Sequence, residues 1–459
     1  MKKLSLLIIK EPLIRKRIFK TALPAMMEMI LYMLIGVVDI AIVGRLGAVP
    51  LAAVALGAQI FFGLVLLLES LGIGAAILVA QAKGAGNRLE VSRVAGQSFM
   101  LAVVVGTAAA VLGLWLAEPF VGLFAVEAEV ERLALLYIHI VFSILPVALT
   151  LYIINSVYRG LGRTDIPMTI AFVVNIVNCA ANYILVYGMG PIPALGVAGS
   201  ALASSLAHVV GLVMACWYFF GGRGGLKVKF RLSERLNWSI IQNIFRLGLP
   251  SMGEQFFLTV SGLISVFLIV FLGTTAYASH EVALAVESLS IMPGFGVAIA
   301  ATALVGQAVG ARDRLAVQKM ARGSLELAVL LMGLLGVVFF CFPQAIARIF
   351  TNDPVLITLA GSLVRIAAFE QLTIALSMTL AGILKGAGDT RTPMYVTTLA
   401  TWAFRIPIMY LLIKVLGLSI AWIWVVFVID WLLRSLVFII VYQRKHWMYR
   451  ALGSELEAG

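Results

Sequence analysis

The sequence predicts an all-α polytopic membrane protein with twelve transmembrane helices in two pseudo-symmetric lobes of six. The first observation is composition, since 62% of the 459 residues are hydrophobic and only 12% are charged, about half the charged share of a soluble domain. The second is the set of long apolar segments, because a helix needs about 20 apolar residues to span a bilayer. The third is an internal repeat. The apolar runs lack the alternation that a membrane β-barrel requires.

Apolar segments bounded by glycine, proline and charged residues mark the expected helices in chain order. In the first lobe they cover residues 20–43, 51–80, 94–116, 133–157, 166–187 and 195–220. In the second lobe they cover residues 244–272, 277–305, 322–342, 356–384, 394–413 and 417–442. We therefore expect a first lobe of residues 1–222, a basic cytoplasmic linker of residues 223–243 and a second lobe of residues 244–459.

Lysine and arginine predict the orientation of these helices. Of 34 such residues, 27 fall in the termini and in every second connection, four fall in the other connections, and three fall inside spans. Because these residues gather in cytoplasmic loops, we expect a multi-pass protein of the plasma (inner) membrane with both termini in the cytoplasm. Topology thus explains the net charge of +12, and we expect no nucleic-acid partner. The three residues inside spans are Arg365, Arg405 and Arg434; none falls in a first-lobe span.

The two halves of the chain repeat each other at an offset of 226 residues. L-P-A-M-M-E at 23–28 falls on L-P-S-M-G-E at 249–254, and nine of 18 positions are identical between 81–98 and 307–324. Because six helices is an even number, the second half enters the membrane from the same side as the first. A parallel repeat of this kind suits a transporter that works by alternating access, in which the two lobes rock against each other around a cavity between them.

Several segments resemble the multidrug and toxic compound extrusion (MATE) family, and the likeness runs from about residue 15 to 445. The resembling segments are V-D-I-A-I-V-G-R-L-G at 38–47, L-V-A-Q-A-K-G-A-G-N at 78–87, R-G-L-G-R-T-D-I-P-M at 159–168, N-I-V-N-C-A-A-N-Y-I-L at 175–185, L-G-V-A-G-S-A-L-A at 195–203, H-E-V-A-L at 280–284, M-P-G-F-G at 292–296 and V-G-Q-A-V-G-A-R-D at 305–313. The resemblance implies an antiporter that exports organic, often cationic, compounds in exchange for Na⁺ or H⁺. We expect small organic cations as partners in the lipid bilayer, no cofactor beyond the coupling ion, and a monomer.

Asp39 is the first candidate for the coupling-ion site. It lies in an apolar stretch of the first expected helix, V-V-D-I-A, and no arginine or lysine falls in a first-lobe span to pair with it. Burial disfavours the charged form of a carboxyl, which suits a proton carrier, and hard oxygen ligands also suit Na⁺. Asn178 and Asn182, four residues apart on the fifth expected helix, add amide oxygens. A structural aspartate capped by hydroxyls or amides is the alternative.

The resemblance agrees with Asp39, because the family carries an acid near this position and polar residues on the fifth helix. One branch has a second acid where this chain has Asn182, so a two-carboxylate site is not expected here. Four further intramembrane acids are candidates for the cavity or for a second-lobe ion path. They are Glu28, its repeat mate Glu254, Glu287 and Glu370. A structural ion pair with Arg365 or Arg405 is an alternative for Glu370, and we interpret Asp430 and Arg434, four residues apart, as a self-neutralising pair.

Two other functions remain as alternatives. A flippase for lipid-linked sugars, from the same wider superfamily, would show a basic central cavity for phosphate. A membrane-embedded enzyme would carry a catalytic signature, and neither H-E-x-x-H nor G-x-S-x-G occurs in the sequence. A cation-coupled exporter is the function that the sequence favours.

Overall fold

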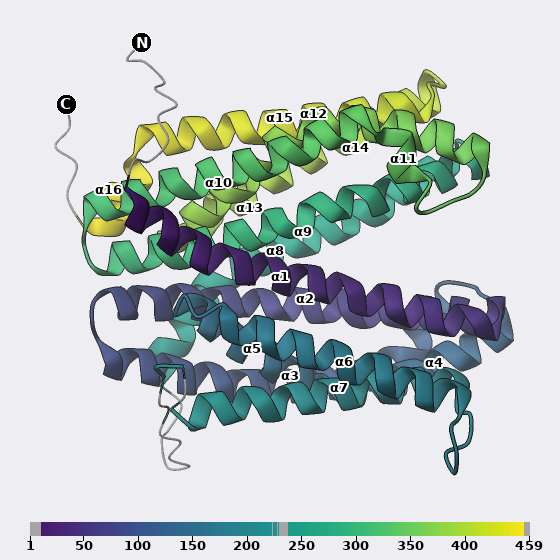
Figure 1. Cartoon of the computed structure of the whole chain (residues 1–459), viewed down its shortest axis with the longest axis horizontal. Helices are drawn as coiled ribbons and strands as arrows, with labels where there is room; N and C mark the ends of the chain where they lie inside the picture. Colours follow the sequence, from purple (N-terminus) through teal and green to yellow (C-terminus); the bar gives the residue numbers. More distant parts are fainter. Residues whose placement is uncertain (1–10, 223, 227, 229–236, 454–459) are drawn as a thin grey trace. The chain divides into compact units, whose positions relative to one another are not determined.

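The chain folds into long helices joined by short connections. The computed structural model describes residues 11–222, 224–226, 228 and 237–453, so residues 223, 227 and 229–236 of the expected linker lie outside the described residues. Within these ranges the chain is helical apart from turns, loops and one isolated bridge between Met189 and Ile192. Figure 1 shows the helices in chain order. The fold class predicted from the sequence is therefore confirmed.

The first repeat contains seven α-helices, and two of them form one membrane crossing. The helices are α1 Pro12–Val43, α2 Ala48–Gly84, α3 Arg88–Gly122, α4 Ala128–Ser143, α5 Leu145–Gly160, α6 Asp165–Tyr187 and α7 Gly196–Phe220. A bend of 54° separates α4 from α5. Because Pro146 stands in the first turn of α5 and lacks an N–H, the break coincides with a residue that cannot continue the preceding helix.

The second repeat has the same plan with an interrupted eleventh crossing. Its helices are α8 Trp238–Val270, α9 Thr274–Gly310, α10 Arg314–Cys341, α11 Pro343–Ala347, α12 Pro354–Gly386, α13 Arg391–Leu399, α14 Ile406–Tyr410, α15 Ile420–Arg444 and α16 His446–Leu452. Two π-helical segments flank α14, at Ala400–Arg405 and Leu411–Val415. In the described residues, eleven helices are long and apolar enough to cross a membrane, and α4 with α5 makes a twelfth.

The helices extend beyond the apolar segments that the sequence marked, because polar residues continue them until a cap. The side chain of Asn87 accepts the backbone N–H of Glu90 at 3.0 Å and begins α3. Its repeat mate Asp313 accepts the backbone N–H of Ala316 at 2.9 Å and begins α10. An N-terminal cap satisfies an amide that the first helical turn leaves open, so both repeats start their third crossing in the same way.

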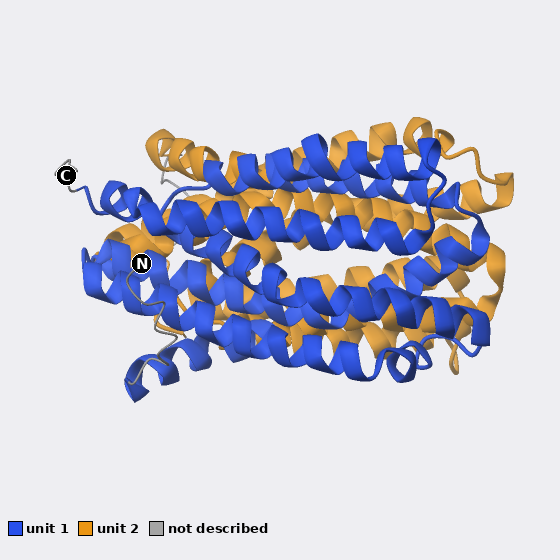
Figure 2. Cartoon of the chain, turned by 90° about the horizontal axis from the view of Figure 1, so that it is seen from above, with its two compact units in different colours: residues 1–26, 84–86, 253–459 blue, residues 27–83, 87–252 orange. Residues whose placement is uncertain are grey.

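The chain divides into two compact units, coloured separately in Figure 2. One unit comprises residues 27–83 and 87–252, and the other comprises residues 1–26, 84–86 and 253–459. Each repeat's first helix, α1 or α8, changes unit two residues after its internal proline, Pro24 or Pro250. The lobe bounds expected from the repeat, 1–222 and 244–459, stay a prediction.

Glycine allows the second and fourth crossings of each repeat to touch. A Cβ on Gly160 of α5 would lie 2.3 Å from the carbonyl oxygen of Ala76 in α2. In the second repeat, a Cβ on Gly386 of α12 would lie 2.5 Å from the carbonyl oxygen of Thr302 in α9. Both pairs differ by the offset of 226 residues. The repeat in the sequence is therefore a repeat in backbone packing, and it fixes the helices that carry the polar sites.

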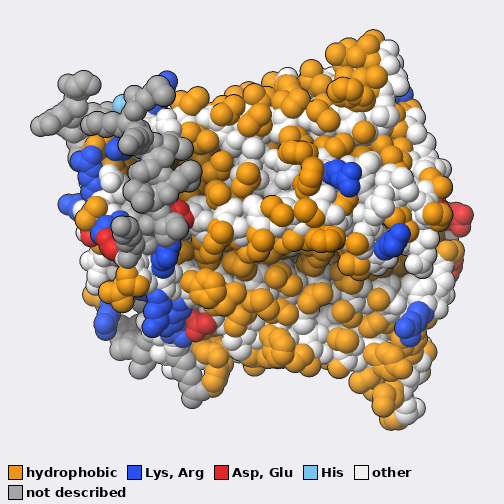
Figure 3. Space-filling model, turned by 45° about the horizontal axis from the view of Figure 1, so that its top comes forward, with side chains coloured by type: hydrophobic (Ala, Val, Ile, Leu, Met, Phe, Trp, Pro, Cys, Tyr) orange, Lys and Arg blue, Asp and Glu red, His pale blue; other side chains and the backbone are white. Residues whose placement is uncertain are grey.

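The surface matches a protein whose helices face lipid. On the face drawn in Figure 3, hydrophobic side chains cover a broad band, and Lys and Arg side chains gather mainly toward one end of it. Many large apolar side chains are exposed on the long helices, among them Trp115, Phe267 and Leu330. Exposed apolar surface of this extent is rare on water-soluble monomers and is normal for a surface in contact with lipid.

Candidate functional site

Asp39 lies in a buried polar site built from α1, α6 and α7. Its side chain is 4% exposed. The Nδ2 of Asn182 donates to Oδ1 of Asp39, and the hydroxyl of Ser204 donates to Oδ2 at 3.5 Å. Asn178 contributes a further hydrogen bond to Asp39 and donates through Nδ2 to the Ser204 hydroxyl at 3.2 Å. The structure thus brings together the three residues expected at the coupling-ion site and adds Ser204.

Within the described part of the chain, several oxygen atoms in or near this site have no hydrogen-bond partner. The carbonyl oxygens Oδ1 of Asn178 and of Asn182 are buried and unpartnered, and so is the hydroxyl of Ser200 on α7. Buried polar atoms without partners are uncommon and call for an explanation. Because carboxylate, amide and hydroxyl oxygens are the ligands that hard cations prefer, the donor set fits a small cation beside Asp39.

Neutral groups surround Asp39. Among the described residues, none of the ion pairs includes it. The hydrogen bonds it receives come from amides and a hydroxyl. An unpaired buried carboxylate is costly in a low-dielectric setting. The site is therefore stabilised when a proton or a metal cation neutralises the carboxylate.

Arg159 corrects the expectation that no basic residue lies in a first-lobe span. The apolar segment 133–157 places it in the connection that follows, but it lies in the last turn of α5 and is buried. Its Nη2 donates to Oε1 of Glu28 at 2.7 Å, and its Nη1 donates to Oε1 of Glu69 at 2.8 Å. The hydropathy of the sequence ended the span at residue 157, which is why Arg159 was assigned to the loop. Glu28 is therefore ion-paired rather than isolated.

Polar side chains of α1, α5 and α7 continue from this ion pair. Tyr32, one turn after Glu28 on α1, hydrogen-bonds with Glu28 and accepts from Nδ2 of Asn155 at 3.2 Å. The ring of Tyr32 lies 5.6 Å from that of Tyr152, whose hydroxyl contacts Nε2 of His208 at 3.3 Å. Three polar positions on α7 (Ser200, Ser204 and His208) are spaced four residues apart. That spacing places them on one helix face, and it is the signal in the sequence that would have found them.

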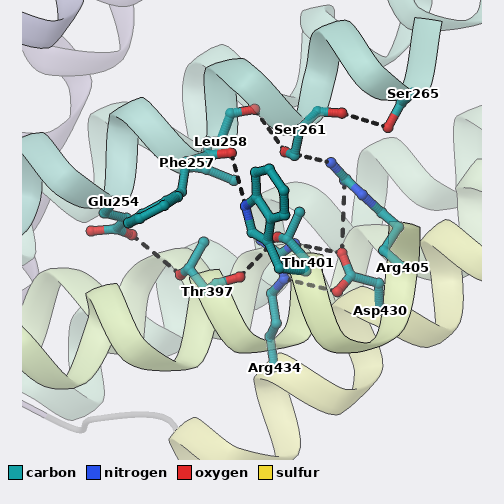
Figure 4. A network of polar contacts seen from close by, with 11 residues as sticks. Glu254, Phe257, Leu258, Ser261, Ser265, Thr397, Thr401, Arg405, Asp430 and Arg434 are labelled. Atoms are coloured by element: carbon teal, nitrogen blue, oxygen red, sulfur yellow. Dashed lines mark hydrogen bonds and ion pairs between the residues drawn. The ribbon is translucent and has the colours of Figure 1, made fainter. Parts of the chain in front are cut away.

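Glu254 occupies the repeat position of Glu28 and is also ion-paired. Its Oε2 lies 2.8 Å from Nζ of Lys385, the repeat mate of Arg159. Its Oε1 accepts from the hydroxyl of Thr397 at 3.2 Å. Figure 4 shows that this hydrogen bond belongs to a longer network of polar contacts, in which Thr401 donates to the backbone oxygen of Thr397 at 2.8 Å. Glu254 is therefore part of a chain of interacting polar side chains.

The same network ends on two arginines that share one aspartate (Figure 4). Arg434 donates to Oδ2 of Asp430 at 2.5 Å and to the hydroxyl of Thr401 at 2.7 Å. Arg405 lies 3.8 Å from Oδ2 of Asp430 and donates to the hydroxyl of Ser261 at 3.3 Å. The expected pair of Asp430 and Arg434 is present. Arg405 ends a π-helical segment, a feature that often marks functional sites.

Glu287 of α9 and Glu370 of α12 form a buried carboxyl pair. The two residues are 6% and 0% exposed and interact electrostatically. Among the described residues, neither carboxyl oxygen of Glu370 has a hydrogen-bond partner. Two buried carboxylates repel each other when both are ionised, so uptake of a proton or a metal cation by one of them relieves the repulsion. Arg405 acts on both groups electrostatically. Arg365, the other expected partner of Glu370, is exposed and lies over the ring of Phe340 at 5.8 Å.

A sequence model of the MatE family matches residues 24–184 and 250–411, which fall in the two repeats. The chain is 31% identical over 445 residues to a protein of Thermotoga maritima named "Probable multidrug resistance protein NorM", covering 96% of this chain and 95% of the relative. It is 30% identical over 399 residues to a protein of the same name from Shewanella oneidensis, covering 86% of each chain.

Solved structures agree on the fold. A transporter of the MOP superfamily from Pyrococcus furiosus, whose description reports a reverse polarity of its binding pocket, superposes with a TM-score of 0.89 at 22% identity and covers 96% of this chain and 97% of that chain. An outward-facing multidrug resistance transporter of the MATE family superposes with a TM-score of 0.86 at 22% identity over the same shares. These likenesses extend over nearly all of this chain.

Proposed function

This chain belongs to the MatE family of membrane transporters, and from that premise we propose that it is a cation-coupled antiporter that exports organic, cationic drugs or metabolites. Its relatives carry the name of multidrug resistance proteins, and the family consists of transporters rather than enzymes. The observation that carries the proposal is Asp39, a buried carboxylate without an ion-pair partner among the described residues.

The proposed mechanism uses Asp39 in two charge states. Without a cation, the carboxylate is held by donors from Asn182 and Ser204. When Na⁺ or H⁺ enters, the site becomes neutral, and amide oxygens of Asn178 and Asn182 are available to Na⁺ as ligands. Because a ligand shifts a conformational equilibrium only by its different affinity for the two states, cation uptake drives substrate release when one state favours neutral Asp39.

A second-lobe path is part of this proposal. Of the four further acids, Glu28 and Glu254 are held by Arg159 and Lys385. Glu287 and Glu370 are buried acids whose like charges repel each other, which supports a role for this pair in cation uptake. Through their ion pairs, Glu28 then holds α1 to α5 and Glu254 holds α8 to α12.

The orientation also belongs to the proposal. We place both termini in the cytoplasm of a plasma (inner) membrane, on the distribution of lysine and arginine. The flippase alternative is less favoured, because a phosphate cavity needs unpaired cations and both Arg405 and Arg434 approach Asp430. We expect a monomer that needs no cofactor besides the coupling ion.

The test is dye efflux from vesicles that contain the purified protein. An imposed Na⁺ gradient and an imposed pH gradient are applied separately, and the gradient that drives ethidium export identifies the coupling ion. Asp39→Asn is expected to reduce export to the level of empty vesicles. Asp313→Asn is the matched control, because asparagine caps a helix as well as aspartate does. Wild-type export by Asp39→Asn would overturn the proposal.

A further inference from the structure

We propose that Glu69 forms a second site for one small monovalent cation, a proton or Na⁺, beside the Glu28–Arg159 ion pair of the first repeat. The inference rests on the proposed cation coupling and adds a site that is separate from Asp39. The site is built from α1, α2 and α5, which each contribute one charged side chain: Glu28, Glu69 and Arg159.

The first step is the balance of charge. Arg159 supplies one positive charge, and Glu28 and Glu69 supply two negative ones within 2.8 Å of its nitrogens. The side chains are 10% exposed for Arg159, 0% for Glu28 and 19% for Glu69. A buried pair can be neutral, but a third charge remains uncompensated and is costly away from water. A bound cation would remove that cost.

The second step identifies Glu69 as the group that takes the cation. Glu28 is held by two nitrogens of the guanidinium, Nη2 at 2.7 Å and Nε at 3.2 and 3.3 Å. Among the residues that the structure describes, Glu69 is held only through Oε1, by Nη1 of Arg159. Because bidentate pairing is the stronger arrangement, Glu28 stays ionised with Arg159. Glu69 is the more exposed carboxylate and the one that can accept a cation.

The third step is an unpartnered oxygen next to the cluster. Asn155 lies one turn before Arg159 on α5 and is 0% exposed. Its Nδ2 donates to Tyr32, which itself hydrogen-bonds with Glu28. Its carbonyl oxygen Oδ1 is buried without a partner. An amide oxygen is a suitable ligand for Na⁺, so the cluster offers a neutral oxygen ligand in addition to the carboxylate.

The fourth step is the contrast with the second repeat. Lys385 and Glu254 repeat the Arg159–Glu28 pair, but Phe295 stands at the position of Glu69 and Ala381 at that of Asn155. The second repeat therefore packs its first and fourth crossings with a neutral ion pair. Since the architecture does not require the extra acid, Glu69 and Asn155 together are a specific addition to the first repeat.

Among the described residues, the other titratable groups around the cluster are Tyr32 of α1 and Tyr152 of α5, and the hydroxyl of Tyr152 contacts His208 of α7. In the proton form, the carboxylate of Glu69 gains a proton on one oxygen and becomes a neutral acid, while Oε1 still accepts from Arg159. In the Na⁺ form, the carboxylate stays ionised and the metal supplies the positive charge. Either form leaves the cluster with equal numbers of positive and negative charges.

The proton form is tested by infrared difference spectroscopy of the purified protein between alkaline buffer and weakly acidic buffer in which exposed glutamates are still ionised. We use Asp39→Asn as the background, so that the Asp39 signal is absent. Glu69→Gln in this background is expected to remove one protonated-carboxyl band. The introduced glutamine side chain keeps an oxygen for Arg159, so folding is expected to survive; the melting temperature checks this. Glu129→Gln, which changes an exposed glutamate paired with Arg132, is the matched control and should leave the spectrum unchanged.

The Na⁺ form is tested by the melting temperature when K⁺ is replaced by Na⁺ at constant ionic strength. In the Asp39→Asn background, Na⁺ is expected to raise the melting temperature, and Glu69→Gln and Asn155→Ala should each abolish the rise. A response to protons but not to Na⁺ assigns the proton form. If Glu69→Gln changes neither readout, the site does not exist. Because neither readout involves export, this failure is distinct from a failure of Asp39 in the efflux assay.

Discussion

The two repeats place different chemistry at equivalent positions of their first helices. Asp39 in α1 receives hydrogen bonds from neutral groups, whereas its repeat mate in α8 is Ser265, which donates to the backbone oxygen of Ser261 at 2.8 Å. Charge in that part of the second repeat is concentrated instead in Asp430, Arg405 and Arg434, which neutralise one another in part. Duplication thus preserved the scaffold while the polar sites diverged.

This difference separates the site of Asp39, which needs a mobile cation, from the site of Asp430, where two arginines supply the positive charge. A carboxylate that faces fixed positive groups gains stability from them and has little affinity for a further cation. A carboxylate among amides and hydroxyls can be neutralised only by a proton or a metal cation that binds from outside the site. The coupling role therefore fits Asp39, and a structural role fits Asp430.

The largest expected loss of stability is that of the variant Asp430→Asn. Asp430→Asn leaves two buried arginines with no carboxylate between them, and breaking a buried ion pair costs about 3–5 kcal/mol. We expect a marked fall in the melting temperature in detergent, or failure to reach the membrane. Asp39→Asn is the contrasting variant and should melt at or above the wild-type temperature, because it removes an unpaired buried charge. If the two variants melted alike, the distinction between the sites would be wrong.

An intermediate effect is expected where the repeats agree. Gly160→Ala and Gly386→Ala each push a methyl group against a backbone oxygen of the neighbouring helix, and overpacking of this kind costs about 1–3 kcal/mol. Both variants should lower the melting temperature by similar amounts. The control is Gly63→Ala in α2, where a Cβ meets nothing within 4 Å. Alanine there should stabilise the helix slightly. A large difference between Gly160→Ala and Gly386→Ala would show that the repeats do not share this packing.

The sequence predicted the architecture well because each helix is long, apolar and repeated. It also predicted that Asp39, Asn178 and Asn182 belong together, since the spacing of the asparagines places both on one face of α6. It could not predict Arg159 as a buried ion-pair partner. That residue lies at a helix end, where hydropathy does not distinguish a loop from a last turn, and its partners lie 131 and 90 positions away in the sequence.

The sequence also could not predict that Glu287 and Glu370 form a pair. Glu287 and Glu370 were each candidates, but a contact between α9 and α12 depends on how the two helices turn about their axes. A shift of one residue turns a side chain through about 100° on an α-helix. Arg365 illustrates the same limit, because it lies five positions from Glu370 and was an expected partner, yet its side chain contacts Phe340.

The smallest expected effect concerns the hydrogen bond that distinguishes Glu254 from Glu28. Thr397→Val removes the hydroxyl that donates to Oε1 of Glu254, and a hydrogen bond to a charged group contributes about 1.5–3 kcal/mol. Because Lys385 still pairs with Oε2 of Glu254, we expect a loss near the lower end, seen as a small fall in melting temperature. The neighbouring Thr398 is a matched control, since its hydroxyl is buried without a partner. Thr398→Val should leave the protein as stable as the wild type or more stable. Equal losses in both variants would mean that the Thr397 hydroxyl does not support Glu254, and that Lys385 alone holds this acid.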